Sequence, residues 1–367
     1  MRRVRVALRA TEDRSYDILI GADTISRLGP AVAARGAGRR ALIVADQAVV
    51  DAWAPVVASS LHAAGIRTHL VWVPSGEASK SLAQASVLYD AALQSGLDRS
   101  GWIVALGGGV VGDLAGFVAA TYMRGVPFVQ VPTTLLSQLD ASVGGKVAVD
   151  HPKGKNLIGA FHQPRLVWID VRTLDSLPIA ELRSGLVEAV KHGLIADARY
   201  YRFVRRNAEA ILAREEGALT RLVAGSCRIK AAVVAADERE ETGQRMLLNL
   251  GHTLGHAIEA VAGYGNIRHG EAVAIGLCAA GRLALRRGLW SRRWQAELEG
   301  TLQGLGLPVR VPDLAWPELL AAMRHDKKVS QGRMRWVLPQ APGRAAVYED
   351  IPVEDVAAVV RELGATD

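Results

Sequence analysis

Short β-rich runs alternate with stretches of helical length across the first half of the chain, and this alternation constrains the fold most strongly. The predicted strands are rich in β-branched and other apolar residues and span 16–20, 41–45, 69–73, 102–106, 128–131 and 166–169. Helical stretches such as 80–94 separate several of them. This order is typical of βαβ units, so we predict a Rossmann-like, mostly parallel sheet covered by helices on both faces.

The character of the sequence changes near Pro178. Beyond it Ala, Leu, Glu and Arg recur at a helical period, and few β-branched runs appear before 335–338. We therefore predict two domains, an α/β domain over 1–177 and an all-α domain over 178–367, with the boundary at 173–178. Two-domain proteins of this build usually bind ligands in the cleft between the domains, and we expect the active site there.

Composition and charge limit the classes of function. Half of the residues are hydrophobic and 22% are charged, and the formal net charge of +7 comes from 44 Lys and Arg against 37 Asp and Glu. A basic chain suits an anionic small molecule, but its cations are spread out and no nucleic acid partner is expected. Two cysteines fit a reducing compartment. Since we find neither an apolar run of about 18 residues nor a signal peptide, we predict a cytoplasmic protein with no membrane partner.

Polar loops follow several predicted strands. Gly107, Gly109 and Gly112 match G-x-G-x-x-G directly after the strand at 102–106. This pattern lets backbone amides approach a pyrophosphate, although a tight strand-to-helix turn would use the same glycines. Asp46 ends an earlier strand, where it could bind ribose hydroxyls or cap a helix. With the loops at 74–80 and 133–134, these segments predict one nucleotide-binding rim.

Lys146 follows two glycines but does not belong to a P-loop. The first position of that motif is occupied by Asp140, and Val147 stands where Ser or Thr is required. We interpret Lys146 as a cation on a loop that forms, with Lys155 and Asn156, a site for phosphate or carboxylate. A solvated basic loop is the alternative.

Histidines and a glutamate form a candidate metal site. His252 and His256 are four residues apart on one predicted helical face, His269 opens another helix, and Glu188 shares a helical face with Lys191. One carboxylate with two or three histidines suits an open divalent site of zinc type. The pattern alone does not say which histidine binds the metal. Metalloprotease chemistry is unsupported, because no glutamate lies between the first two histidines.

Three longer motifs carry a resemblance to a known family. They are GGGVVGDLAGFVAATYMR at 107–124, PTTLLSQLDASVGGK at 132–146 and LNLGHTLGH at 248–256. With them the chain resembles, over nearly its whole length, the 3-dehydroquinate synthase family of sugar phosphate cyclases. The family commonly has phenylalanine where Leu250 and Leu254 stand, and both replacements remain apolar.

The resemblance implies roles for individual residues. The implied metal ligands are Glu188, His252 and His269, and His256 is a group on the substrate side. The implied contacts with NAD are Ser75, Gly76, Glu77, Ala78, Ser79, Lys80, Gly109, Val110, Val111, Gly112, Asp113, Thr133, Thr134, Lys146, Lys155, Thr173, Leu174, Asp175 and Ser176. The implied substrate and catalytic set is Arg124, Asp140, Lys146, Asn156, Lys191, Lys230, Arg245, Asn249, His256, His269 and Lys327 or Lys328. Arg124 would reach the site of a neighbouring subunit, which implies a homodimer.

The implied reaction converts 3-deoxy-D-arabino-heptulosonate 7-phosphate to 3-dehydroquinate and phosphate, a step of aromatic amino acid biosynthesis. It would use NAD transiently and a divalent metal, Zn²⁺ or Co²⁺. The alternatives are another sugar phosphate cyclase, such as one acting on an amino analogue of this substrate, and a metal-dependent glycerol or alcohol dehydrogenase. A dehydrogenase of a neutral alcohol would not need the many cations present here. A non-enzymatic nucleotide-binding module would leave Glu188, His252 and His269 unexplained.

Overall fold

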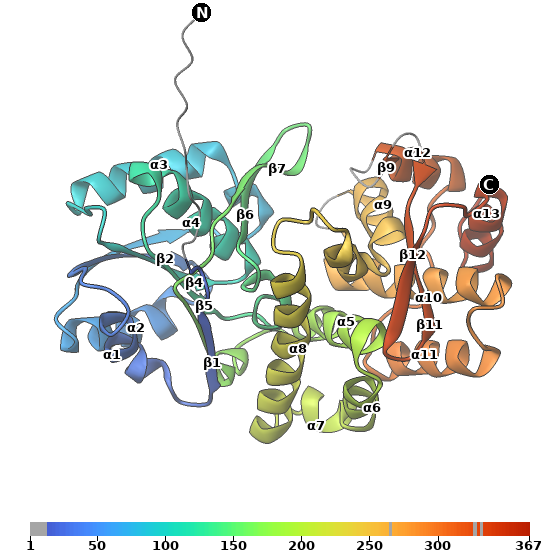
Figure 1. Cartoon of the computed structure of the whole chain (residues 1–367), viewed down its shortest axis with the longest axis horizontal. Helices are drawn as coiled ribbons and strands as arrows, with labels where there is room; N and C mark the ends of the chain where they lie inside the picture. The colour runs from blue at the N-terminus through green and yellow to red at the C-terminus, as the bar shows by residue number, and fades with distance from the viewer. Residues whose placement is uncertain (1–12, 264–265, 326–328, 331–332) are drawn as a thin grey trace, which may run out of the picture.

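A computed structural model describes residues 13–263, 266–325, 329–330 and 333–367 of the chain. Figure 1 shows a sheet with its covering helices in one half of the molecule and an assembly of helices in the other. None of the helices in the described residues combines the length and the apolar character needed to cross a membrane.

All six predicted strands are present and form one parallel sheet. Their order is β1-β8-β5-β4-β2-β3, and each neighbouring pair runs parallel. Their bounds are Asp17–Gly21 (β1), Arg40–Asp46 (β2), Arg67–Val73 (β3), Trp102–Gly107 (β4), Phe128–Pro132 (β5) and Leu166–Asp170 (β8). The predicted parallel sheet is therefore confirmed.

Helices cover both faces of this sheet, as predicted. Along β4, Ile103 and Ala105 pack into one apolar cluster, while Val104 and Leu106 pack into another on the opposite face. The first face is covered by α3 (Leu82–Gln94) and α4 (Gly109–Thr121), and the second by α1 (Leu28–Ala33) and α2 (Val50–Ala63). A strand that is apolar on both sides is what a buried parallel strand requires.

A hairpin beside the sheet was not predicted. It consists of β6 (Lys146–His151) and β7 (Gly154–Phe161), which pair antiparallel. Lys146 is the first residue of β6, so its placement on a loop is wrong. The segment extends because Val147 and Val149 pack into the same cluster as α4 and because β-branched residues favour strands.

The second half of the chain is helical. Its α-helices are α5 (Ile179–Ala196), α6 (Ala198–Arg206), α7 (Ala208–Leu212), α8 (Glu216–Ala236), α9 (His252–Ala262), α10 (His269–Arg286), α11 (Arg292–Gly304), α12 (Trp316–His325) and α13 (Val353–Glu362). It also contains two antiparallel strand pairs, β9 (Val329–Ser330) with β10 (Arg333–Met334) and β11 (Trp336–Ala341) with β12 (Arg344–Tyr348). The domain is thus helical with small hairpins rather than all-helical. Trp336, Val337 and Leu338 of β11 are buried in the helical core.

Short helices connect these elements. They are the 3₁₀ helices η1 (Ile25–Arg27), η2 (Glu77–Ser79), η3 (Tyr122–Arg124), η5 (Val171–Leu174) and η6 (Gln244–Asn249), and the π-helical turn η4 (Ser137–Ala141).

One apolar core joins the two halves of the molecule. Val167 and Ile169 of β8 and Leu135 and Leu139 near η4 belong to the same cluster as the buried residues of the helical half. The chain leaves β8 at Asp170 and enters α5 at Ile179. Residues at the edge of the sheet are therefore held against the helices that carry Glu188 and the histidines.

Candidate active site

The parallel sheet brings the predicted nucleotide loops to one edge. Asp46 at the end of β2 is paired with Val73 at the end of β3, and Gly107 at the end of β4 is paired with Pro132 at the end of β5. The segments that follow these strands carry Ser75–Lys80, Gly109–Asp113 and Thr133–Thr134. The carboxyl ends of parallel strands are where open α/β sheets bind nucleotides.

The glycines of the loop after β4 allow close packing at this edge. A Cβ on Gly112 would lie 2.8 Å from Gln130 Oε1, and one on Gly107 would lie 3.0 Å from the Cβ of Asp46. Gly108 precedes α4, whose amino terminus therefore opens at the rim. These positions serve the tight turn and leave a helix amino terminus available to an anion, so both uses of the pattern are compatible.

Asp46 lies in this rim and does not cap the following helix. Its Oδ1 accepts a hydrogen bond from the Ser75 hydroxyl. It also accepts one from the backbone N–H of Ala48, with 2.9 Å between the nitrogen and Oδ1. The residue in the cap position of α2 is Val49. The cap interpretation of Asp46 is therefore wrong.

Lys80 links the nucleotide rim to the hairpin. Its Nζ lies 2.6 Å from Asp113 Oδ2 and donates to Asn156 Oδ1, and the residue is only 5% exposed. Burial raises the pKa of Asp113, against the opposing effect of Lys80. Lys155 approaches Glu77 at 3.8 Å. Residues predicted for cofactor and for substrate thus form one contact network.

The candidate metal ligands converge from three helices. Glu188 lies in the middle of α5, His252 is the first residue of α9 and His269 is the first residue of α10. Glu188 Oε1 lies 3.7 Å from His252 Nε2 and 4.0 Å from His269 Nε2. One possible ligand atom from each residue lies within 4.8 Å of those of the other two.

The contacts around these three residues suit a divalent metal. His252 Nδ1 contacts the carbonyl oxygen of Leu250 at 3.2 Å, and His269 Nδ1 contacts Glu259 Oε2 at 3.0 Å, which leaves both Nε2 atoms on the side of Glu188. Among the described residues, neither oxygen of the buried Glu188 carboxylate has a hydrogen-bond partner, although Oε2 forms an ion pair with Lys191. A carboxylate with two imidazoles held through Nδ1 is a common donor set for zinc and similar ions.

Three of the predicted cations in the described residues each form an ion pair with an acidic side chain. Lys191 pairs with Glu188, Lys230 Nζ lies 2.7 Å from Asp140 Oδ1, and Lys146 pairs with Glu240. Burial would raise the pKa of Asp140, but Lys230, Lys191 and His192 outweigh it and hold that pKa well below its usual range. The site is therefore rich in cations that are already neutralised.

Arg245 is anchored by backbone groups as well as by an acid. It is 3% exposed and donates to the carbonyl oxygens of Gly144 at 3.1 Å and of Glu238 at 2.8 Å. Its Nε lies 3.7 Å from Glu240 Oε1. Because Gly144 precedes the hairpin and Arg245 lies in η6, this contact joins the two halves of the molecule.

The remaining predicted residues are placed less uniformly. Thr173 is buried and receives a hydrogen bond from Gln138 at 3.0 Å, Leu174 is buried, and Asp175 and Ser176 are exposed. Asn249 ends η6, and the His256 ring centroid lies 5.3 Å from that of His252. Lys327 and Lys328 lie outside the described residues.

Arg124 is not brought to this cluster within one chain. It is exposed and follows α4 at the end away from the rim, about 20 Å along the helix. Its φ of 68° and the φ of 48° at Met123 place both residues in left-handed backbone.

Three residues with direct contacts to this site were missed by the sequence analysis. Glu240 pairs with Lys146 and Arg245, Glu259 binds His269, and His192 contacts Asp140. Glu259 follows His252 by seven residues, a spacing that places both on one helical face and that the sequence offered as a signal. Glu240 and His192 reach their partners only through the fold.

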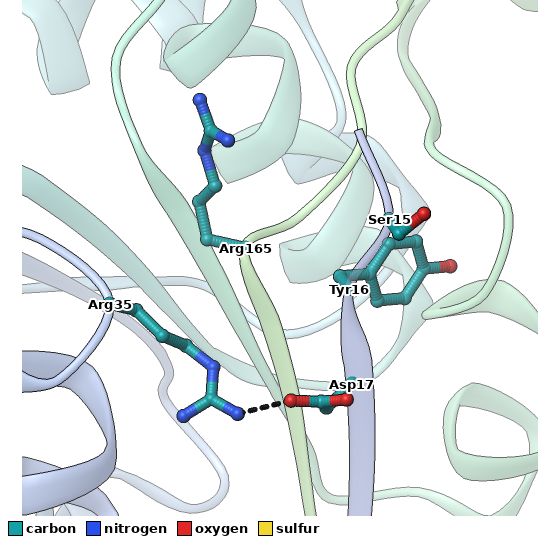
Figure 2. Close-up of a pocket in the computed structure, with 5 residues that line it drawn as sticks. All are labelled: Ser15, Tyr16, Asp17, Arg35 and Arg165. Atoms are coloured by element: carbon teal, nitrogen blue, oxygen red, sulfur yellow. Dashed lines mark hydrogen bonds and ion pairs between the residues drawn. The ribbon is translucent and has the colours of Figure 1, made fainter. Parts of the chain in front are cut away.

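A separate pocket lies at the opposite edge of the sheet (Figure 2). It has a volume of about 270 Å³ and is lined by Ser15, Tyr16, Asp17, Arg35 and Arg165. Asp17 begins β1 and Arg165 precedes β8, so the pocket lies at the amino ends of the strands. It contains none of the predicted site residues.

Comparisons with known proteins agree with this arrangement. Family models described as 3-dehydroquinate synthase N-terminal and C-terminal match residues 70–184 and 185–329. A 3-dehydroquinate synthase from Desulforamulus reducens is 47% identical over 351 residues, which is 95% of this chain and 98% of the relative.

Two solved structures are similar over almost the whole chain. One is a 2-epi-5-epi-valiolone synthase from Streptomyces hygroscopicus subsp. jinggangensis with NAD⁺ and Zn²⁺ bound, with a TM-score of 0.89, 28% identity and coverage of 98% of this chain and 99% of that one. The other is a 2-deoxy-scyllo-inosose synthase with carbaglucose-6-phosphate, NAD⁺ and Co²⁺, with a TM-score of 0.86, 26% identity and coverage of 95% and 97%. The two family models, the close relative and the shared fold lead to one conclusion: this chain belongs to the 3-dehydroquinate synthase family, within the sugar phosphate cyclases.

Proposed function

We propose that this chain converts 3-deoxy-D-arabino-heptulosonate 7-phosphate to 3-dehydroquinate and inorganic phosphate. The observation that carries the proposal is the position of Lys191 and the pair Lys230–Asp140 beside the Glu188, His252 and His269 cluster. A substrate with both a phosphate and a carboxylate needs several cations, whereas a neutral alcohol does not.

NAD and a divalent metal are the proposed cofactors. NAD would lie along the edge formed by the loops after β2, β3, β4 and β5, and Zn²⁺ or Co²⁺ would be held by Glu188, His252 and His269. When bound, NAD takes up and returns the hydride of one ring carbon, and the metal polarises the oxygen on that carbon. The solved structures with NAD⁺ and Zn²⁺ or Co²⁺ support this assignment.

The chain's own residues bind and orient the substrate. Lys146, Lys191 and Arg245 would neutralise its anionic groups, which requires that they exchange their present carboxylate and carbonyl partners for substrate oxygens. Lys327 would join them. Asn156, Asn249 and His256 would hold hydroxyl groups by hydrogen bonds, and Asp140 would keep the Lys230 ammonium in place.

Oxidation of one ring carbon makes the C–H bond of its neighbour acidic. Elimination of phosphate then needs a proton acceptor near that C–H bond. We infer that the departing phosphate itself accepts this proton, so that no side chain has to act as a dedicated base. Lys146 would hold the phosphate for that transfer, and ring opening and closure to the carbocycle would follow without further groups from the chain.

The active form is proposed to be a homodimer in the cytoplasm. Arg124 is exposed and distant from the cluster of its own chain, which suits a residue that completes the site of a second subunit. Both cysteines are buried and unpaired, as expected in a reducing compartment.

Phosphate release tests the proposed function. The purified chain is given the heptulosonate 7-phosphate with NAD and with Zn²⁺ or Co²⁺, and each component is omitted in turn. We expect release only with all components present, and slow release from a heptulose 7-phosphate that lacks the carboxylate. No release from the complete mixture, or faster release from the substrate without carboxylate, would contradict the proposal.

A further inference from the structure

Glu259 lies beside the candidate metal cluster on the side away from Glu188. It is carried by the third turn of α9, is 8% exposed, and its Oε2 lies 3.0 Å from His269 Nδ1. His269 is thus contacted on both ring nitrogens by carboxylates, since its Nε2 lies 4.0 Å from Glu188 Oε1.

This contact determines which nitrogen of His269 carries the proton. An ionised carboxylate can only accept a hydrogen bond, so His269 Nδ1 must donate and the Nε2 lone pair is directed to the Glu188 side. His252 receives the same orientation from a backbone carbonyl, that of Leu250 at 3.2 Å. The two imidazoles therefore present the same nitrogen to Glu188 by different means, one through backbone and one through a side chain.

Because Glu259 contacts His269 through its side chain, a single substitution can remove this contact. His269 is the first residue of α10, and its side chain is 30% exposed, compared with 11% for His252 and 1% for Glu188. The His252 and His256 rings also lie near the His269 ring, at 5.3 and 6.1 Å between centroids. Glu259 supplies the charged hydrogen-bond acceptor at Nδ1, which has a large effect on the orientation of the ring.

We propose that Glu259 is a positioning residue for the metal centre, which holds His269 in the tautomer and orientation that binds the ion. The inference rests on the metal assignment of the proposed function and adds to it a residue outside the ligand set. The carboxylate also raises the basicity of the imidazole, which strengthens the bond from Nε2 to a metal.

The test must also distinguish this role of the Glu259 carboxylate from a role as a metal ligand. His256, Glu259 and His269 also offer ligand atoms that lie within 4.8 Å of one another. Glu259 would then be a ligand of a second ion rather than a support for the first. The stoichiometry of metal binding distinguishes the two, because positioning predicts one ion per chain, whereas a second site that uses Glu259 predicts two ions in wild type and one in Glu259→Gln.

The test is a titration of the metal-free protein with Co²⁺, in which calorimetry measures affinity and stoichiometry and the visible absorption spectrum is recorded. Wild type should bind one ion, and Glu259→Gln should bind one ion about 10- to 100-fold more weakly with an altered spectrum. Glu259→Asp keeps the charge but withdraws it from the ring, and should also bind more weakly. His252→Ala gives the reference for a lost ligand.

Glu271→Gln is the matched control. Glu271 lies in the first turn of α10, the helix that begins at His269, but its carboxylate accepts from Arg268 rather than from His269. Its Co²⁺ affinity and spectrum should equal those of wild type. The thermal midpoints of the metal-free proteins show whether Glu259→Gln has simply failed to fold, and in that case Glu259→Asp carries the comparison.

The outcomes separate the inference from the function on which it rests. Wild-type affinity and spectrum in both Glu259 variants would overturn the positioning role. Two ions per wild-type chain, of which Glu259→Gln loses one, would replace it with a second site. A wild type that binds no Co²⁺ would contradict the proposed metal centre itself.

Discussion

Cations in the candidate site are held by carboxylates of the same chain. Glu240 contacts both Lys146 and Arg245, Asp140 contacts Lys230, and Glu188 contacts Lys191. Such pairs keep the cations oriented. An anionic ligand must displace the carboxylate from its cation, and the free energy that this exchange costs reduces the free energy of binding. A substrate phosphate carries more charge than a carboxylate and can compete for a lysine.

Lys146 is the residue at which this exchange can be measured. Half of its side chain is exposed, so Lys146→Met keeps the packing of the stem and removes the charge. We expect kcat/KM to fall roughly 10- to 150-fold, because hydrogen bonds to charged groups contribute about 1.5–3 kcal/mol. NAD affinity should change less, since the amides at the start of α4 remain.

Steady-state kinetics with Arg228→Met as the control complete this test. Arg228 is 71% exposed in its side chain and its nearest acid is Asp197 at 3.8 Å, so this variant removes one positive charge away from the site. Its kcat/KM should match wild type. Equal kcat/KM in Lys146→Met and wild type would show that Lys146 is a solvated residue without a role in binding.

At the scale of elements, the metal cluster depends on how closely α10 packs against α5. A Cβ on Gly270 would lie 1.9 Å from the carbonyl oxygen of Ser184, one turn before Glu188. Gly270→Ala should therefore separate the two helices, widen the Glu188–His269 distance and destabilise the fold by about 1–3 kcal/mol. We expect a lower thermal midpoint and weaker Co²⁺ binding.

Gly300 provides the matched glycine for this prediction. It lies inside α11, and a Cβ there would meet no heavy atom within 4 Å. Gly300→Ala should be neutral or stabilise the protein by about 0.5–1 kcal/mol, and should leave metal binding unchanged. Gly270→Ala with wild-type stability and affinity would mean that the helices adjust without affecting the cluster.

The ion pair between Asp140 of η4 and Lys230 of α8 predicts that the stability of the fold depends on pH. The pKa of Asp140 is held well below 3.8 in the folded chain, so its carboxylate stabilises the fold above that pH, and this stabilisation is lost as the pH falls through the folded value. Asp140→Asn should lower the free energy of unfolding by about 2 kcal/mol at neutral pH, with a smaller difference in acid.

Denaturant titrations at several pH values measure this effect. Asp350→Asn serves as the control, because the Asp350 side chain is 71% exposed and pairs with Arg287 at the surface. It should change the free energy of unfolding little at any pH. If the difference in the free energy of unfolding between wild type and Asp140→Asn stays constant from neutral pH to acid, the pKa of Asp140 is not lowered in the folded chain.

For the molecule as a whole, the sequence predicted what depends on local pattern. The six strands of the sheet are rich in apolar residues, and the loops that follow them needed only the parallel order to meet at one edge. Helix spacing placed Glu188 beside Lys191 and His252 beside His256. The family resemblance supplied the choice among the histidines.

What the sequence did not predict depends on contacts between distant residues. The strand beginning at Lys146 forms because Val147 and Val149 pack on α4, and β11 forms because Trp336 is buried among helices. The pairs of Glu240 with Lys146 and of Glu259 with His269 join separate elements. No periodic pattern records such pairs.

In the proposed reaction, this chain uses NAD as a catalyst and releases phosphate from an acidic sugar phosphate. This proposed reaction is tested most directly by following phosphate and the absorbance of reduced nicotinamide together, with metal present and NAD at a small fraction of the substrate concentration. We expect many phosphates released per NAD and no accumulation of reduced nicotinamide. One reduced nicotinamide formed per turnover, with the reaction stopping when NAD is consumed, would contradict it and identify a dehydrogenase.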